Sequence, residues 1–146
     1  MAIRQPPRGF VTDDPPETQF GEAQSWYQLI GPLFAAEDNE PGRVRLGFYS
    51  EQRYISSMGR VHGGKLSSFV DYLLFATARS TWEETMLVTV SLNINFVSAS
   101  PPDVWVTGYG QSVHSGRSMA FVSGEVRAND KIIVQATGTF RRLDKR

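Results

Sequence analysis

The 146-residue chain contains no cysteine and only two histidines, His62 and His114. Without cysteine there is no disulfide, no thiolate nucleophile and no cysteine-ligated zinc site. Two histidines are too few for a multi-histidine metal site, so we expect no bound metal. A chain of this length buries a hydrophobic core without either kind of cross-link.

The chain also lacks an excess of charge and a long apolar segment. Fifteen basic and fifteen acidic residues balance to a formal net charge of zero, which gives no general attraction to nucleic acid and does little to oppose self-association. No apolar run approaches the roughly 20 residues that cross a bilayer. The first residues show neither a signal-peptide core nor a transit-peptide pattern. We therefore expect a cytoplasmic protein with no nucleic-acid or membrane partner.

Proline is concentrated at the N-terminus, where "QPPR" and "DDPPE" fall within the first 20 residues. This composition predicts an extended Pro-rich arm at residues 1–20 and a single domain at residues 21–146. A hydrophobic content of 40% and a charged content of 21% are typical of a globular domain. Within it, "EAQSWYQLIGPLF" (22–34) is expected to begin as a short helix and continue into a strand.

The rest of the chain predicts one long helix among strands. Residues 43–50 alternate apolar and polar side chains, the period of a half-buried strand, and residues 51–64 have no period and are expected to form a loop. "GKLSSFVDYLLFATARST" (64–81) has no proline and dense apolar residues, which predicts a buried helix. Four strands are expected to follow, at 86–97, 103–114, 118–128 and 131–143.

The connections between these four strands are too short for parallel crossovers, so the sheet is expected to be antiparallel. A helix that is apolar on most of its faces must be enclosed, which predicts an α+β fold with a strongly curved sheet around the helix. Strand 86–97 is long and regular, so at a sheet edge it would have to be covered or paired. Pairing with a second copy would produce a dimer with a continuous sheet.

Asp71 is an acid inside the apolar run "SFVDYLLFATA". At about 100° per residue around the helix axis, four side chains fall within about 60° of one another and form the predicted solvent-exposed stripe. Asp71 lies about 60 to 120° away from this stripe. No cationic residue stands three or four positions away, so Asp71 has no partner on its own helix. We expect it to face a cleft or a partner chain. The predicted stripe consists of Lys65, Ser68, Tyr72 and Arg79.

Two glycines precede the acid at the expected start of the helix. Gly63 and Gly64 are expected to leave unpaired backbone N–H groups at the positive end of the helix dipole, a site that suits an anion or a polarised carbonyl oxygen. The alternative is that they merely form a flexible entry to the helix. His62 is either a base or a structural hydrogen-bonding residue, and His114 is interpreted as a strand-end residue. No "GxSxG", "GxxxxGK[ST]" or "GxGxxG" motif is present.

Taken together, three segments resemble one known family. "GRVHGGKLSSFVDYLLFAT" resembles the HGG…D signature of hotdog-fold acyl-CoA thioesterases of the phenylacetate-pathway-like family, part of the thioesterase superfamily. "LVTVSLNINFVSASPP" resembles the central strand of that family, and "SVHSGRSMAFVSGEVRANDKIIVQATGTF" resembles its last hairpin. The resemblance covers about residues 43 to 141. It implies a hotdog fold, a homodimer formed through a strand edge or a dimer of dimers, and active sites at the subunit interface.

The resemblance also implies roles for individual residues. Gly63 would polarise the thioester carbonyl through its N–H, and Asp71 would act as general base on water or as nucleophile. Thr89 would help to orient water, and Ser56 stands where many members have asparagine. The reaction would need no cofactor, because coenzyme A is part of the substrate. The remaining candidate positions are His62 at the catalytic site and Gly64, Ser115, Gly116, Arg117 and Ser118 for binding substrate and CoA.

Candidate acyl-pocket residues are Phe69, Tyr72, Leu73, Trp26 and Tyr27, although large apolar side chains are also common in an ordinary core. An alternative function is a non-catalytic acyl-CoA-binding or regulatory module on the same fold. A hotdog hydratase or dehydratase pairs histidine with an acid in different motifs, and the sequence contains no match to them.

Overall fold

A computed structural model describes residues 4–13, 26–38, 40–82 and 86–143. Its seven strands form one antiparallel sheet with the order β1-β2-β3-β5-β6-β7-β4. The elements are β1 (Phe10–Thr12), α1 (Trp26–Ile30), β2 (Phe34–Ala36), β3 (Arg43–Tyr49), the 3₁₀ helix η1 (Gln52–Tyr54), α2 (Gly63–Arg79), β4 (Met86–Phe96), β5 (Trp105–Ser115), β6 (Met119–Ala128) and β7 (Lys131–Leu143).

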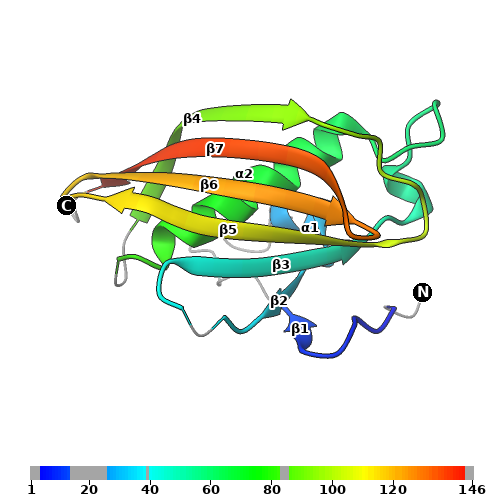
Figure 1. The fold of residues 1–146 in the computed structure, drawn as a ribbon, viewed down its shortest axis with the longest axis horizontal. Helices are drawn as coiled ribbons and strands as arrows, with labels where there is room; N and C mark the ends of the chain where they lie inside the picture. Colours follow the sequence, from blue (N-terminus) through cyan, green and yellow to red (C-terminus); the bar gives the residue numbers. More distant parts are fainter. Residues whose placement is uncertain (1–3, 14–25, 39, 83–85, 144–146) are drawn as a thin grey trace.

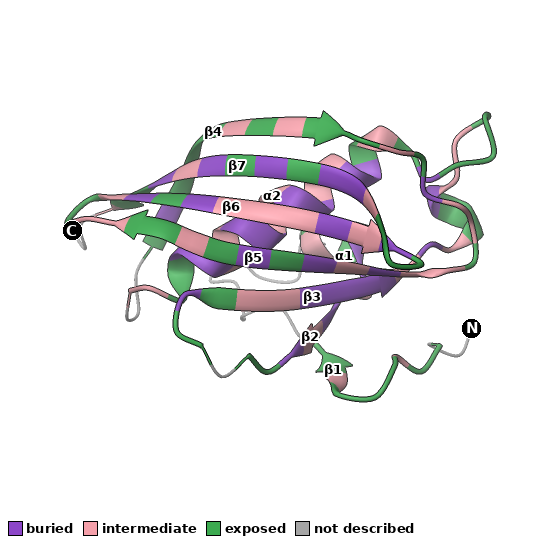
Figure 2. Ribbon diagram, in the orientation of Figure 1, coloured by how far each residue is buried: buried purple, intermediate pink, exposed green. Residues whose placement is uncertain are grey.

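The long helix α2 crosses the inner face of the curved sheet (Figure 1). Its contacts reach β3, β4, β5, β6 and β7, so the sheet wraps the helix as predicted. The α+β fold class is therefore confirmed, and the four C-terminal strands lie within two residues of their predicted bounds. Burial alternates along β5 and β7, whereas β4 is mostly exposed (Figure 2).

Glycines in the strands let the sheet approach the helix closely. A Cβ atom built on Gly110 would lie 1.9 Å from Thr77 Oγ1, and one on Gly124 would lie 2.8 Å from Leu74. Gly108 has the same relation to Phe69 and Leu73. The helix therefore packs directly against strand backbone at these positions. Leu73, Leu74 and Phe69 are fully buried.

The predicted solvent stripe of α2 is wrong at Lys65 and needs correction at Tyr72. Lys65 is only 7% exposed, and its Nζ donates a hydrogen bond to the carbonyl oxygen of Ile30. Tyr72 is half-buried and packs edge-on against Tyr27, with ring centroids 4.6 Å apart. The reason is α1, which covers this side of α2. Ser68 is partly exposed and Arg79 is exposed, so the open face is narrower than predicted.

The two edge strands differ in character. At one edge, the three residues of β1 pair with β2, so part of the Pro-rich arm belongs to the sheet, a strand that the sequence did not predict. At the other edge, β4 pairs with β7 through ten of its eleven residues, all except Val90, which is the edge position that the sequence raised as a possibility. The division into an arm at 1–20 and a domain at 21–146 stays a prediction. Among the described residues, no helix is long and apolar enough to cross a membrane.

Candidate active site

Asp71 and Thr89 meet on the side of α2 that faces β4. The Thr89 hydroxyl donates a hydrogen bond of 3.0 Å to Asp71 Oδ1. Asp71 is partly exposed and Thr89 is exposed, and neither carboxylate oxygen takes part in an ion pair within the described part of the chain. The structure thus brings together two residues that are eighteen positions apart in the sequence.

A β-bulge directs Thr89 toward the helix. The register between β4 and β7 shifts between Thr89 and Ser91, which makes Val90 the extra residue. Thr89 pairs with Phe140, a fully buried residue on the helix side of the sheet. Two positions beyond the bulge, Leu92 pairs with Gly138 and also faces inward. The bulge therefore places both Thr89 and Leu92 on the inner face, although a regular strand would alternate them.

Gly63 begins α2 and carries a free backbone donor. Among the residues that the structure describes, no acceptor takes its N–H. A Cβ at this position would lie 3.6 Å from the ring of Phe96 at the end of β4. The N–H therefore points out of the first turn of a 17-residue helix, where the helix dipole adds to its partial positive charge.

His62 is the N-cap of this helix. Its Nδ1 accepts a hydrogen bond of 2.9 Å from the Gly64 N–H. The structure therefore differs from the expectation at Gly64, whose donor is already paired. An Nδ1 that accepts this bond is not available to take a proton from water, which favours the structural role of His62.

The other predicted site residues lie farther away or are held locally. Ser56 sits in a tight turn, where its Oγ accepts a hydrogen bond of 3.3 Å from the Met58 N–H and its own N–H donates to Arg60. His114 stacks obliquely on Phe121 in the neighbouring strand, consistent with a strand residue.

The turn 115–118, which contains the predicted CoA-binding residues other than Gly64, lies at the opposite end of α2. Ser115 Oγ is 2.8 Å from Thr81 Oγ1, and the Trp82 indole donates to the Gly116 carbonyl. Arg117 and Ser118 are exposed. At 1.5 Å per residue, this turn is about 25 Å along α2 from Gly63 of the same chain.

A pocket of about 450 Å³ opens between α1 and the beginning of α2. Trp26, one of the predicted acyl-pocket residues, lines it. Phe69 and Leu73 instead lie in the core with no exposed surface, and Tyr72 packs against Tyr27. A larger hollow of about 640 Å³ contains none of the predicted site residues. The pocket walls are Trp26, Leu29, Ile30, Arg53, Tyr54, Ile55, His62, Gly64, Lys65 and Ser68.

Lys65 is the functional candidate that the sequence did not reveal. Burial, and secondarily the positive charge of Arg53, lower the pKa of its amine from 10.5 to about 7. Tyr54 is buried beside it, and burial raises the pKa of that phenol to about 12. The lysine directly after His-Gly-Gly is surface-like by helical geometry alone. Only the position of α1 reveals that it is buried.

Comparison with known proteins identifies the family. The model of the thioesterase superfamily matches residues 58–134, more than half of the chain. This segment holds the HGG motif, Asp71, Thr89 and the 115–118 turn. The chain belongs to the thioesterase superfamily and is a thioester hydrolase with the hotdog fold.

Individual relatives agree with this family. A putative esterase of Pseudomonas aeruginosa, PA0474, is 27% identical over 113 residues, which cover 77% of this chain and 84% of that protein. Human acyl-coenzyme A thioesterase 13 is 24% identical over 122 residues, which cover 81% and 85% of the two chains. The Streptococcus mutans protein smu.793, solved bound to acetyl CoA, superimposes with a TM-score of 0.74 at 21% identity. That match covers 88% of this chain and 99% of the other.

Proposed function

We propose that the protein hydrolyses the thioester of an acyl- or aryl-CoA to the free acid and CoA. The observation that carries this proposal is the Asp71 carboxylate, fixed by Thr89 on the face of α2 beside β4. The names of the human relative and of the acetyl-CoA complex point to acyl-CoA as the substrate class. The cytoplasmic location predicted from the sequence stays a prediction.

The chemistry uses groups that the chain already contains. Thr89 bonds to Oδ1, and the other oxygen of Asp71 has no hydrogen-bond partner among the described residues, so it can take a proton from a water molecule as that water attacks the carbonyl carbon. Alternatively, the same oxygen attacks the carbonyl directly and water then hydrolyses the anhydride. In either route negative charge develops on the carbonyl oxygen, which the Gly63 N–H stabilises, and CoA leaves as a thiolate that is then protonated.

One chain alone does not place these groups around one thioester. Gly63 and Asp71 are eight residues apart on α2, which is about 12 Å along the helix axis. A carbonyl oxygen bonded to Gly63 is therefore too far from Asp71 of the same chain. We propose that each site combines Gly63 of one subunit with Asp71 and Thr89 of its partner.

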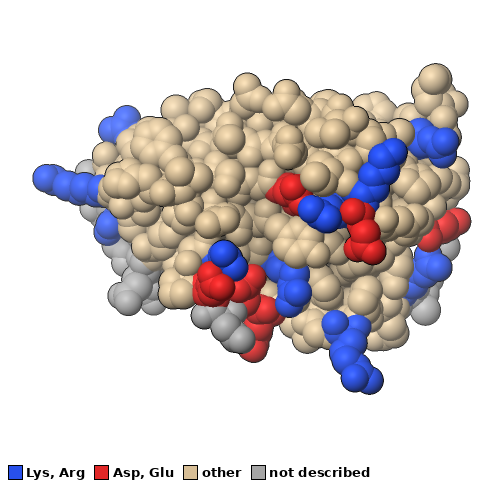
Figure 3. All heavy atoms as spheres, viewed as in Figure 1, with Lys and Arg blue, Asp and Glu red and all other residues tan. Residues whose placement is uncertain are grey.

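The exposed edge of β4 supports this assembly. Met86, Val88, Val90 and Phe96 are between 41% and 59% exposed, and β4 contains no charged residue. Figure 3 shows no charged side chain along the middle of that edge. Antiparallel pairing of two β4 strands would set the two α2 helices side by side in opposite directions. The beginning of one helix would then lie beside the middle of the other.

The same arrangement gives the 115–118 turn a role. It lies about 25 Å from Gly63 of its own chain, but an antiparallel partner helix would begin closer to it. We propose that Arg117 and the turn contact the phosphates of CoA bound to the partner's Gly63. Whether two such dimers associate into a tetramer is a further prediction from the sequence.

The test is replacement of Asp71 by asparagine, which keeps the shape and removes the base. Free thiol released from a panel of acyl-CoAs should fall by about 10² to 10⁴-fold in Asp71→Asn. Asp130→Asn, an exposed acid in the β6–β7 turn, is the matched control and should retain wild-type turnover. Undiminished hydrolysis by Asp71→Asn would refute the mechanism, and tight acyl-CoA binding by the wild type without turnover would favour the binding-module alternative.

A further inference from the structure

The pocket beside α1 begins next to the proposed oxyanion donor. Gly64 and His62 line it, and Gly63, whose N–H would hold the thioester oxygen, is the residue between them. A volume of about 450 Å³ is within the usual size of small-molecule sites. An acyl group attached to a carbonyl on Gly63 therefore starts beside two residues that line this pocket.

One side of the pocket is apolar. Trp26 and Leu29 of α1 are 65% and 51% exposed, and the partly buried Ile55 also lines the pocket. Such side chains suit the methylene groups of an acyl chain, because contact with the chain removes apolar surface from water.

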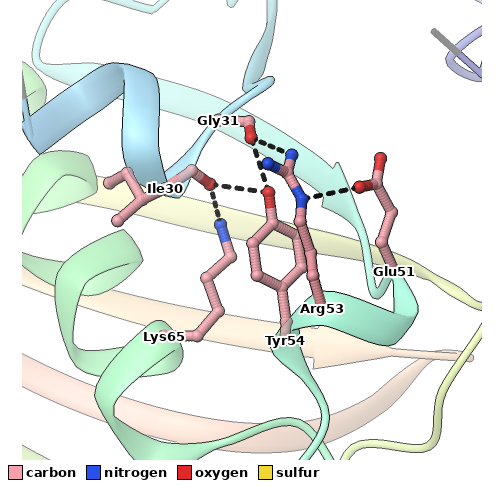
Figure 4. Close-up of polar contacts among 6 residues, drawn as sticks. All are labelled: Ile30, Gly31, Glu51, Arg53, Tyr54 and Lys65. Atoms are coloured by element: carbon pink, nitrogen blue, oxygen red, sulfur yellow. Dashed lines mark hydrogen bonds and ion pairs between the residues drawn. The ribbon is translucent and has the colours of Figure 1, made fainter. Parts of the chain in front are cut away.

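The pocket is also lined by Lys65, whose amine forms no ion pair with any described residue. Lys65 Nζ donates to the carbonyl oxygen of Ile30 and lies 4.0 Å from the ring centre of Phe48 and 4.3 Å from that of Tyr54. A lysine ammonium has three donors, and Ile30 is its one hydrogen-bond acceptor among the described residues. Figure 4 shows the amine pointing at that carbonyl.

Among the residues that the structure describes, no acid forms an ion pair with Lys65. Glu51 is the acid whose charge acts on Lys65, but its carboxylate is 2.9 Å from Arg53 Nε in an ion pair. Arg53 itself donates a hydrogen bond to the carbonyl oxygen of Gly31, the residue after Ile30 (Figure 4). His62 and Tyr54 are the other titratable groups on the pocket wall. The protonated form of this buried amine is therefore stabilised by an anion that arrives with a ligand.

We infer that this pocket binds the acyl group of the substrate, and that Lys65 selects acyl chains that end in a carboxylate. This inference rests on the proposed thioester hydrolysis at Gly63. Two helical residues and one lysine side chain separate the Gly63 N–H from Lys65 Nζ, a span of at most about 11 Å. Dicarboxylic acyl groups of about four to six carbons fit that span.

The test compares adipyl-CoA with hexanoyl-CoA, which have the same number of carbons and differ in the terminal carboxylate. The wild type should show a kcat/KM at least about tenfold higher for adipyl-CoA. In Lys65→Met the ratio of the two values should fall by about tenfold or more. Lys131→Met, a change of the same kind at the exposed first residue of β7, should keep the wild-type ratio.

A second pair of variants covers the case in which Lys65→Met does not fold. Leu29 is half exposed on the pocket wall, so Leu29→Glu adds a negative charge there with little demand on the core. It should lower the adipyl-to-hexanoyl ratio several-fold, whereas Leu29→Gln, of nearly the same shape, should lower it much less. A wild-type ratio near one, or ratios unchanged in both Lys65→Met and Leu29→Glu, would overturn the inference.

Binding separates this inference from the proposed function. Thioether analogues of the two CoA esters cannot be hydrolysed, and the wild type should bind the adipyl analogue with a dissociation constant about tenfold lower. If neither thioester is hydrolysed but this preference holds, the proposed hydrolysis fails and the pocket assignment stands. If both esters are hydrolysed and the two analogues bind equally, the pocket assignment fails and the hydrolysis stands.

Discussion

At the scale of single residues, the sequence predicted the acid but not its electrostatic surroundings. Asp71 was recognisable because it interrupts an apolar run and has no cation on its own helix. Its hydrogen bond to Thr89 depends on a strand that begins fifteen residues later, so only the resemblance placed the two residues in one site. Lys65 was misassigned because a helical projection contains no information about α1, which covers it.

The buried amine of Lys65 should make stability depend on pH. Its pKa is about 7 in the folded chain and near 10.5 when exposed. Between these values the unfolded chain holds a proton that the folded chain lacks, so raising the pH favours folding. The free energy of unfolding should therefore rise with pH in the wild type relative to Lys65→Met, by about 2 kcal/mol between pH 7.5 and 9.5.

Urea unfolding at several pH values and one fixed protein concentration measures this difference. Lys131→Met should follow the wild type across the same range. If the wild-type and Lys65→Met curves stay parallel between pH 7.5 and 9.5, the amine is not neutralised by folding and this explanation is wrong.

At the scale of elements, periodicity located α2 and the long strands, because each has its own repeat of apolar residues. It did not locate β1, since three residues in a Pro-rich segment carry no period and pair only because β2 is adjacent. It also gave no reason for the glycines of β5 and β6. In the sequence of a single strand, these glycines weaken the alternation of apolar and polar residues. Their role is visible only in the structure, where side chains of α2 pack directly against them.

Gly110 provides the test of that close packing. Gly110→Ala should lower the free energy of unfolding by about 1–3 kcal/mol, because its Cβ would lie 1.9 Å from Thr77 Oγ1. The Thr77→Ala substitution removes that oxygen. In the Thr77→Ala background, Gly110→Ala should therefore lower the free energy of unfolding by less than it does in the wild type. Gly116→Ala, where the nearest atom is 3.6 Å away, is the control for thermal or urea unfolding. Equal effects at both glycines would contradict the role assigned to close contact.

At the scale of the whole molecule, sequence patterns predicted a helix enclosed by the sheet and a strand that would need a partner at a sheet edge. They did not predict that the site is divided between subunits. The proposed division follows from the distance between Gly63 and Asp71 along α2, and no residue type indicates it. The proposed division is testable because Gly63 tolerates a substitution that removes its donor. His62, the preceding residue, has φ −64° and ψ 136°, which is compatible with a following proline, and proline is accepted at the first helical position.

Mixed subunits should therefore recover activity. Gly63→Pro and Asp71→Asn should each be nearly inactive alone. Unfolded and refolded together in equal amounts, they should regain about a quarter of wild-type thiol release. Half of the dimers would then contain one chain of each kind, and one of their two sites would be intact. The control is Asp71→Asn alone, unfolded and refolded in the same way. If each site belonged to a single chain, the mixture would stay inactive.

The glycines beneath α2 have a consequence for how this protein can change. Where the sheet offers backbone instead of side chains, the spacing between helix and sheet is set by the helix residues Phe69, Leu73, Leu74 and Thr77. Variation that alters catalytic geometry is then concentrated in one short segment of the gene, the same segment that encodes Gly63, Lys65 and Asp71. A library restricted to α2 would sample the spacing between helix and sheet together with these three site residues, whereas the glycine codons opposite it would tolerate almost no larger side chain.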